Sequence, residues 1–284
     1  MRILVTGARG QLGYDVCLEL KARGFEDVRA IDLEELDITD EGAVQRYVAE
    51  YKPDAVMHNA AFTAVDRAEE NAALCRRVNA LGTKYLAEAA ANAHAKLLYI
   101  STDYVFNGEK EGEYFPDDER DPQSVYGATK AEGEDFVRAA CDKYFIVRIS
   151  WVFGKNGNNF VKTMLRLAET KKELNVVCDQ IGSPTYTADL APLLCDMIVT
   201  EKYGTYHATN AGSCSWSEFA QAIFQAAKKA VKVNPVTTAE YTALVPQQAK
   251  RPKNSRMNKD NLTACGFTPL PHWQDALKRY LLEL

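Results

Sequence analysis

Short apolar segments recur along the first half of the chain, separated by stretches with helical periodicity. The five segments are residues 2–6 (RILVT), 28–32 (VRAID), 55–59 (AVMHN), 97–101 (LLYIS) and 145–149 (FIVRI). They are mostly apolar rather than alternating, which is typical of parallel strands covered on both faces. Between the first two, Leu12, Val16 and Leu20 recur every four residues, as on one helix face. The pattern predicts an α/β fold with a doubly wound parallel sheet.

The second half of the chain has a mixed pattern. Residues 158–171 carry one apolar helical face, and Ser215 and Glu218 have capping-box spacing before another apolar helical stretch. A last helical face runs from Trp273 to Leu284. Residues 107–125 are rich in acids, Gly and Pro, which indicates a long loop, either a functional lid or mobile. We expect one domain over 1–153, with later segments returning to it, and a smaller α/β domain over 154–284.

Composition narrows the classes of protein. The 284 residues carry 34 Lys+Arg and 39 Asp+Glu, a net charge of −5, which disfavours general binding to nucleic acid or to anionic membranes. No apolar run approaches the ~18 residues of a membrane helix, and the apolar start is too short for a signal peptide. The seven cysteines are scattered without a C-x-x-C pair, so we expect reduced thiols and a cytoplasmic location.

A glycine-rich loop follows the first predicted strand. Gly7, Gly10 and Gly13 stand between that strand and a helix, where glycine permits a tight turn and close approach of a phosphate to the helix N-terminus. Asp32 ends the second strand 19 residues after Gly13, where a carboxylate accepts hydrogen bonds from an adenosine ribose. The combination predicts a Rossmann-type dinucleotide-binding domain over 1–153 and a mainly substrate-binding domain over 154–284.

Three polar residues lie between the fourth and the fifth predicted strands. Tyr126 and Lys130 are four residues apart at the start of a helical segment, so they share one face. A nearby ammonium and an oxidised nicotinamide ring would lower the pKa of a tyrosine from its usual ~10. Thr102 follows the fourth strand, at the sheet edge where ligands bind in such folds. Y-x-x-x-K is common on helix surfaces, and only this context favours a catalytic interpretation.

Together these features resemble the extended short-chain dehydrogenase/reductases, over essentially the whole chain. Within them, further segments are similar to the dTDP-4-dehydrorhamnose reductases, which reduce the C4 ketone of dTDP-4-dehydro-L-rhamnose to give dTDP-L-rhamnose for polysaccharide synthesis. These segments are 59–66 (NAAFTAVD), 101–106 (STDYVF), 148–153 (RISWVF), 158–164 (NNFVKTM) and 251–256 (RPKNSR).

The resemblance implies roles for individual residues. Tyr126 would donate the proton, Lys130 would be its electrostatic partner and Thr102 would tune the pair. The residues expected to line NADH or NADPH are Gly7, Gly10, Gln11, Leu12, Gly13, Asp32, Asp37, Ile38, Ala61, Phe62, Thr63, Tyr126 and Lys130. The residues expected to contact the sugar nucleotide are Thr102, Asp103, Trp151 and Arg251. The alternative for Trp151 is that it packs in the core. The alternative for Arg251, with Lys253 and Arg256, is that these residues belong to a solvated basic loop.

Cofactor choice receives two opposed signals. Asp32 should repel the 2′-phosphate of NADPH and accept from the ribose hydroxyls of NADH. Arg9, in the glycine loop, is able to pair with that phosphate instead. The resemblance implies that both cofactors are used, and we expect a modest preference for NADH.

The resemblance also implies a homodimer around Mg²⁺. Its carboxylate ligands would be Asp15, Asp189 and Glu283, of which Asp15 and Asp189 stand where the family has Glu. Each is one methylene shorter, and Mg²⁺ tolerates little misplacement. The alternative is that all three are solvent-facing helix carboxylates.

Two other functions remain open. A sugar-nucleotide 4-epimerase uses the same Tyr/Lys pair but retains its cofactor, whereas a dehydratase has Glu where Tyr104 follows Asp103 here. The regulatory subunit of methionine adenosyltransferase resembles the same reductases and acts by binding a partner. The complete set of Thr102, Tyr126 and Lys130 disfavours that non-enzymatic hypothesis.

Overall fold

Six parallel strands form the central sheet of the computed structural model, which describes residues 1–284, in the order β10-β5-β4-β3-β1-β2. Its strands are β1 (Ile3–Thr6), β2 (Val28–Ile31), β3 (Ala55–His58), β4 (Lys96–Thr102), β5 (Tyr144–Ile149) and β10 (Gly204–His207). The first five agree with the predicted strands to within one residue at each end. The sixth was not predicted, because its sequence GTYH is short and not an apolar run.

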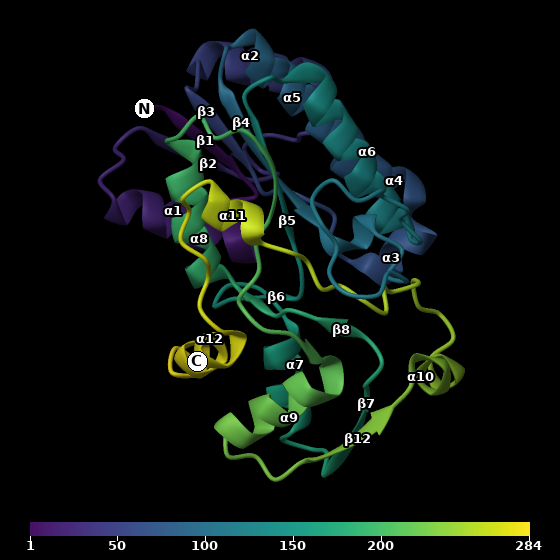
Figure 1. Ribbon diagram of the computed structural model, residues 1–284. Coiled ribbons are helices and arrows are strands. Elements are labelled where there is room, and N and C mark those ends of the chain that lie inside the picture. Colours follow the sequence, from purple (N-terminus) through teal and green to yellow (C-terminus); the bar gives the residue numbers. More distant parts are fainter.

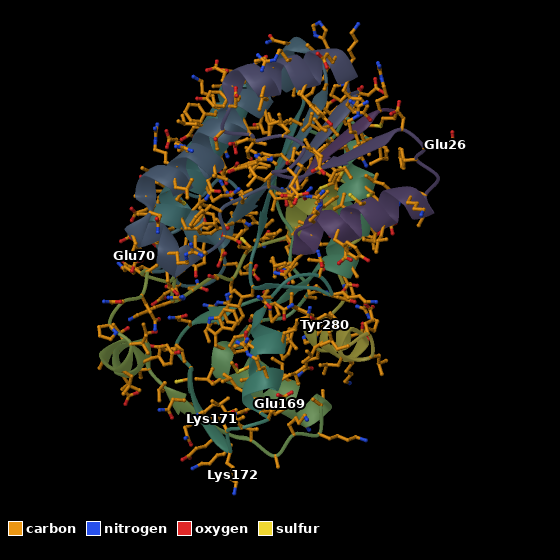
Figure 2. All side chains as sticks on the ribbon, turned by 180° about the vertical axis from the view of Figure 1, so that it is seen from behind. Glu26, Glu70, Glu169, Lys171, Lys172 and Tyr280 are labelled. Carbon is orange, nitrogen blue, oxygen red and sulfur yellow. The ribbon has the colours of Figure 1, made fainter.

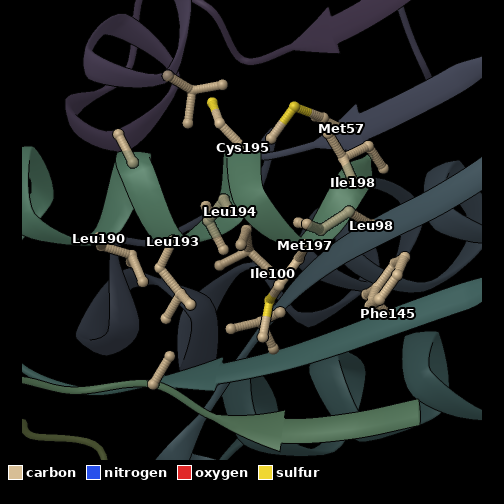
Figure 3. Close-up of a cluster of buried hydrophobic side chains, with 14 of the residues drawn as sticks. Met57, Leu98, Ile100, Phe145, Leu190, Leu193, Leu194, Cys195, Met197 and Ile198 are labelled. Atoms are coloured by element: carbon tan, nitrogen blue, oxygen red, sulfur yellow. The ribbon is translucent and has the colours of Figure 1, made fainter. Parts of the chain in front are cut away.

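Helices cover both faces of the sheet (Figure 1). On one face lie α1 (Gln11–Ala22), α8 (Thr187–Ile198) and α11 (Asp260–Ala264), and on the other α2 (Glu41–Tyr51), α5 (Gly82–Asn92) and α6 (Val125–Ala140). Figure 3 shows side chains of α8, Leu194 and Met197 among them, against Leu98 and Ile100 of β4. Burial on both faces explains why the inner strands β1, β3, β4 and β5 are mostly apolar, whereas Arg29 and Ala30 of the edge strand β2 are exposed. Residues 187–207 therefore return to the sheet after the chain has left it.

A smaller unit follows the sheet in sequence and lies at one end of it (Figure 1). It contains α7 (Phe160–Leu167), α9 (Trp216–Ala226), α10 (Thr238–Leu244), α12 (Trp273–Leu281) and the parallel pair β7 (Glu173–Val177) and β12 (Lys232–Val236). Shorter strands are β6 (Val152–Phe153), β8 (Ile181–Gly182), β9 (Thr185–Tyr186) and β11 (Cys214–Ser215). In Figure 2, Lys171 and Lys172 lie at the outer tip of this unit, whereas Tyr280 lies inside the molecule.

Most local predictions for the second half are confirmed. Ser215 and Glu218 form the predicted capping box of α9. The last helix ends at Leu281, however, so the prediction of a helical face as far as Leu284 is wrong, and the Leu284 side chain is exposed. None of the helices combines the length and apolar character that crossing a membrane requires.

The loop 107–125 is present as predicted, and none of its residues lines the cavity described below. Its residue Tyr114 is buried and stacks on Phe106 with ring centroids 4.2 Å apart. The Tyr114 amide donates to the carbonyl of Arg256 at 2.8 Å. Three elements from earlier in the chain pack against α6, namely α3 (Val65–Glu70), α4 (Ala72–Arg76) and a π-helical turn (Arg77–Leu81).

Candidate active site

A cavity of about 1000 Å³ opens at the carboxyl ends of the sheet strands. It is at the upper end of the ~300–1,000 Å³ found for small-molecule sites. Residues after β1, β2, β3, β4 and β5 line it, together with Gly157 and Asn158 from the loop before α7. The parallel sheet thus brings residues that are remote in sequence to one place.

The glycine loop forms the wall between β1 and α1. Gly7 has φ +65°, and a Cβ there would lie 2.7 Å from the backbone of Ala60. A Cβ on Gly13 would lie 2.1 Å from the carbonyl oxygen of Gly7. Gly10 is the N-cap of α1 and offers no side chain to its first-turn N–H groups. These groups are left for an anionic ligand, so the turn fits the pyrophosphate of a dinucleotide.

Asp32 lies at the end of the cavity beside this loop. Its carboxylate accepts hydrogen bonds from the amides of Arg9 at 3.0 Å and Leu33 at 2.9 Å. Asp37 accepts from the amide and hydroxyl of Thr39, and both residues line the cavity. Among the remaining residues expected at the cofactor, those that line the cavity are Gln11, Leu12, Ile38, Ala61, Phe62 and Thr63.

Asn59 and Asn79 were not identified from the sequence. The Asn79 side chain accepts from the amide of Phe62 at 2.7 Å and donates to its carbonyl at 3.1 Å, which fixes the loop after β3. Asn59 lines the cavity, and its Oδ1 is buried without a hydrogen-bond partner. An orphaned buried acceptor calls for an explanation, and a bound donor would supply one. The motif NAAFTAVD contains Asn59, but nothing in it marks Asn79.

The catalytic candidates meet at the opposite end of the cavity. Thr102 is the last residue of β4, and Tyr126 and Lys130 lie in the first turns of α6, which Ser124 caps through the amide of Gly127 at 3.1 Å. A Cβ on Gly127 would lie 2.2 Å from the carbonyl oxygen of Tyr104, so α6 packs directly on the segment after β4. This contact brings Tyr126 next to Thr102.

Burial dominates the protonation of these groups. It raises the pKa of Tyr126 above its usual value, the negative charge of Asp103 raises it further, and hydrogen bonding by Thr102 acts in the opposite direction. The chain's own groups therefore raise the pKa of Tyr126, and its lowering by an oxidised nicotinamide ring stays a prediction. Burial lowers the pKa of Lys130 to about 7, although Glu134 opposes the shift. The ammonium lies 4.1 Å from the ring centroid of Tyr99.

Beneath these residues lies a buried ion pair that the sequence analysis missed. Glu134 is fully buried and accepts from Arg148 of β5 at 2.7 and 2.8 Å and from the hydroxyl of Ser101 at 2.6 Å. Burial would raise the pKa of Glu134, but Arg148 and Ser101 outweigh it and lower that pKa to about 2. The sequence contained a sign of this ion pair, because Glu134 is one helical turn after Lys130 and Arg148 is a charged residue within an apolar strand.

Asp103 and Trp151 line the cavity beside the catalytic candidates. Burial raises the pKa of Asp103 to about 6, although hydrogen bonds from Ser255 and Thr102 oppose the shift. Trp151 has φ +49°, a conformation rare for a bulky residue, and stacks on Trp216 with centroids 3.6 Å apart. Trp151 is only half-buried, so it is part of the cavity wall rather than a core tryptophan.

Arg251 does not reach the cavity wall. Its guanidinium donates to Asp66 at 2.8 Å and to the carbonyl of Ala249 at 3.2 Å. Lys253 and Arg256 are likewise absent from the cavity lining. The role of Arg251 toward substrate stays a prediction.

The three proposed metal ligands do not form a cluster of carboxylates able to hold an ion within one chain. Both oxygens of Asp189 accept from Arg279 at 2.7 Å, and Glu283 accepts from the hydroxyl of Tyr186 at 2.7 Å. Asp15 is buried, with one carboxylate oxygen unpartnered. Asp15 and Asp189 are thus not the solvent-facing carboxylates of the alternative, and Arg279 neutralises Asp189. The Mg²⁺ dimer stays a prediction that sedimentation with Mg²⁺ and with a chelator would test.

Comparison with known proteins gives consistent matches along the whole chain. The family model "RmlD substrate binding domain" matches residues 1–284. The spore coat polysaccharide biosynthesis protein SpsK of Bacillus subtilis (strain 168) is 43% identical, over 99% of this chain and 97% of its own. The dTDP-4-dehydrorhamnose reductase of Aggregatibacter actinomycetemcomitans is 45% identical over 98% and 97%.

A solved structure is equally similar. The crystal structure of dTDP-4-dehydrorhamnose reductase from Bacillus anthracis str. Ames in complex with NADP has a TM-score of 0.95 to this chain. It is 46% identical, with 100% of this chain and 99% of that chain covered. The likeness spans the sheet and the smaller unit alike.

Proposed function

This chain belongs to the RmlD substrate-binding domain family, and from that premise we propose that it is an NAD(P)H-dependent oxidoreductase that reduces the C4 ketone of dTDP-4-dehydro-L-rhamnose to dTDP-L-rhamnose. The observation that carries the proposal is the meeting of Thr102, Tyr126 and Lys130 at one end of a cavity whose other end is the glycine loop. Residues 1–153, joined by β10, hold the dinucleotide, and residues 154–284 mainly hold the sugar nucleotide. The reaction takes place in the cytoplasm.

The residues present fit a dinucleotide on structural grounds. Gly7 and Gly13 have no room for a side chain, the N-terminus of α1 is uncapped, and Asn59 keeps an unpartnered acceptor in the cavity. When bound, the nicotinamide supplies the hydride, which protein side chains cannot. The chain itself supplies the proton and the surroundings of the reacting ketone.

Tyr126 is the proton donor in this mechanism. A ketone that accepts a hydride at C4 develops negative charge on its oxygen, and the phenol protonates that oxygen as the charge appears. The raised pKa of Tyr126 keeps the proton on the donor before the reaction. Thr102 orients the ketone and the phenol through its hydroxyl. The Lys130 ammonium stabilises the phenolate that remains, until solvent returns a proton to it.

The sugar nucleotide lies against the wall of the cavity formed by Asp103 and Trp151. The indole presents a flat apolar surface to a sugar ring, while Trp216 stacks on Trp151 and holds it in place. Asp103 is already engaged by Thr102 and Ser255, at 2.9 and 2.5 Å, so it positions Thr102 as well as bordering the substrate.

An assay of NADH and NADPH oxidation with dTDP-4-dehydro-L-rhamnose, beside a small panel of other 4-keto sugar nucleotides, tests the proposal. We expect oxidation of one cofactor per sugar reduced, with the highest kcat/KM for the rhamnose precursor. A 4-epimerase would convert the sugar without releasing oxidised cofactor. Absence of cofactor oxidation together with an unchanged sugar, for every keto sugar, would leave the non-enzymatic role as partner-binding subunit.

A further inference from the structure

Arg9 is held by two glutamates at the adenosine end of the cavity. Its guanidinium donates to Glu34 at 2.8 Å and to Glu35. Arg9 and Lys130 are the basic residues among those that line the cavity, and Lys130 lies at the catalytic end. Arg9 is therefore the one lining cation close to Asp32.

The acidic loop after β2 wraps around this arginine. Asp32 accepts from the backbone amide of Arg9 at 3.0 Å, and Glu35 accepts from the amide of Asp32 at 2.8 Å. Glu35 thus has a structural role in the turn besides its pairing with Arg9. Glu34 makes no hydrogen bond except that to Arg9, and its side chain is 81% exposed.

The charge around Arg9 affects the binding of NAD(H) and NADP(H) differently. A ribose 2′-hydroxyl donates a hydrogen bond to a carboxylate, whereas a 2′-phosphate carries about −1.5 to −2 charges at neutral pH. Asp32, Glu34 and Glu35 carry three negative charges against the one positive charge of Arg9. A 2′-phosphate would have to take Arg9 from both glutamates while it lies beside Asp32.

We propose that Glu34 and Glu35 determine cofactor specificity by holding Arg9 away from the position of a 2′-phosphate, so that the chain selects NAD(H) over NADP(H). The inference rests on the dinucleotide binding in the proposed function, but not on the identity of the sugar substrate. It resolves the opposed signals of Asp32 and Arg9, because an arginine that is already neutralised cannot offset the aspartate.

Isothermal titration of the full-length chain with NAD⁺ and with NADP⁺ tests the inference without catalysis. The measured quantity is the ratio of the two dissociation constants, Kd for NADP⁺ over Kd for NAD⁺. We expect the wild type to favour NAD⁺ about tenfold. Exposed ion pairs are weak, so Glu34→Gln should lower the ratio only about two- to fivefold. Glu34→Lys should lower it by about tenfold or more, because it adds a cation as well.

A matched control separates local pairing from net charge. Glu26→Gln removes the same charge at an exposed acid before the amino end of β2, the end opposite Asp32, and should leave the ratio unchanged. Arg9→Gln in the Glu34→Gln background should reverse the gain in NADP⁺ affinity, since the released guanidinium provides it. Raising the salt concentration should shrink every difference, because these groups are exposed.

Several outcomes would overturn the inference. Equal affinity of the wild type for both dinucleotides, an unchanged ratio in Glu34→Lys, or an equal shift in Glu26→Gln would each do so. Failure to bind either dinucleotide would refute the proposed function and the inference together. Selective NAD⁺ binding without reduction of any keto sugar would refute the proposed substrate and leave the inference standing.

Discussion

The two ends of the cavity use charged side chains in different ways. At the adenosine end, the side chains of Arg9 and Glu34 are 55% and 81% exposed and pair in contact with water. At the catalytic end, Lys130 is buried, and Glu134 and Arg148 beneath it are almost completely excluded from water. Exposed pairs are worth little and can be exchanged without loss of the fold, whereas a buried charge must keep its partner.

The difference assigns different tasks to the two ends. Exposed charges discriminate between ligands by attraction and repulsion, at small cost to stability. At the catalytic end burial itself changes protonation: it lowers the pKa of Lys130 and raises the pKa of Tyr126, while the buried charge of Glu134 opposes the shift of Lys130. Substitutions at the catalytic end should therefore produce large effects on rate and stability, and those at the adenosine end small effects on selectivity.

The largest effect is expected for Tyr126→Phe. Removal of the phenolic hydroxyl deletes the proton donor and should lower kcat by about 10²–10⁴-fold, while dinucleotide affinity and the melting temperature stay near wild type. Lys130→Met should do comparable harm. Steady-state kinetics measures the kcat of each variant, and thermal unfolding measures its melting temperature. Tyr85→Phe, which removes a hydroxyl from a tyrosine on α5 outside the cavity, is the control. Near wild-type turnover in folded Tyr126→Phe would refute the mechanism.

Glu134→Gln should destabilise the chain by about 3–5 kcal/mol, because it leaves the Arg148 charge buried without a counter-ion. Glu132→Gln on the same helix breaks only the surface pair with Arg76 and should cost at most about 1 kcal/mol. Urea denaturation measures both.

Acid unfolding provides an independent check of the same pair. The pKa of Glu134 is about 2 when folded and lies near 4.5 when unfolded, so its ionisation stabilises the fold above pH 4.5. That contribution is lost as the pH falls from about 5 toward 2. Glu134→Gln should abolish this part of the pH dependence. If the Glu132 and Glu134 variants were equally stable, the contrast between buried and exposed pairs would be wrong.

The pH profile of kcat/KM should report Lys130. With its pKa lowered to about 7, the ammonium is lost as the pH rises, and the rate should fall up to tenfold per pH unit above that value. The raised pKa of Tyr126 keeps the phenol protonated over the same range, so the lysine titrates first. In Lys130→Met the alkaline limb should disappear from the profile. Its persistence in that variant would assign the limb to another group.

Thr102→Val should have the smallest effect at the catalytic end. The hydroxyl contributes a hydrogen bond rather than a proton, and one such bond is worth ~0.5–1.5 kcal/mol, or about two- to tenfold in kcat/KM. Valine has nearly the same shape as threonine, so the substitution should preserve the end of β4. A loss as large as that of Tyr126→Phe would show that Thr102 takes part in proton transfer itself.

Local patterns were sufficient for much of this protein. Five strands of the sheet were predicted to within a residue at each end, four of them because a strand buried on both faces is mostly apolar, whereas β2 is an edge strand with two exposed residues. The sixth strand, β10, is short and mixed in sequence, and it is a strand because it pairs with β5. The capping box of Ser215 and the glycine turn are equally local, since their chemistry lies within a few residues.

Charged partners across the fold were not predictable in this way. Arg9 was expected to be available to a phosphate, but Glu34 and Glu35 occupy it, and Arg251 was expected at the substrate but pairs with Asp66. In each case the partner is 25 or more residues away in sequence. The spacing of residues along the chain does not predict which of several acidic residues a flexible cationic side chain pairs with.

The sequence by itself determined five of the six strands of the sheet, the glycine turn between β1 and α1, and the types of residue that we propose do the chemistry. These depend on periodicity, backbone freedom and side-chain chemistry, which act over short distances along the chain. The tertiary structure alone decided which of those residues are buried, what each one pairs with, and so the directions of the pKa shifts of Tyr126 and Lys130. Burial and charge proximity are properties of space rather than of sequence distance, because desolvation and electrostatic energies depend on the atoms that the fold brings around a group.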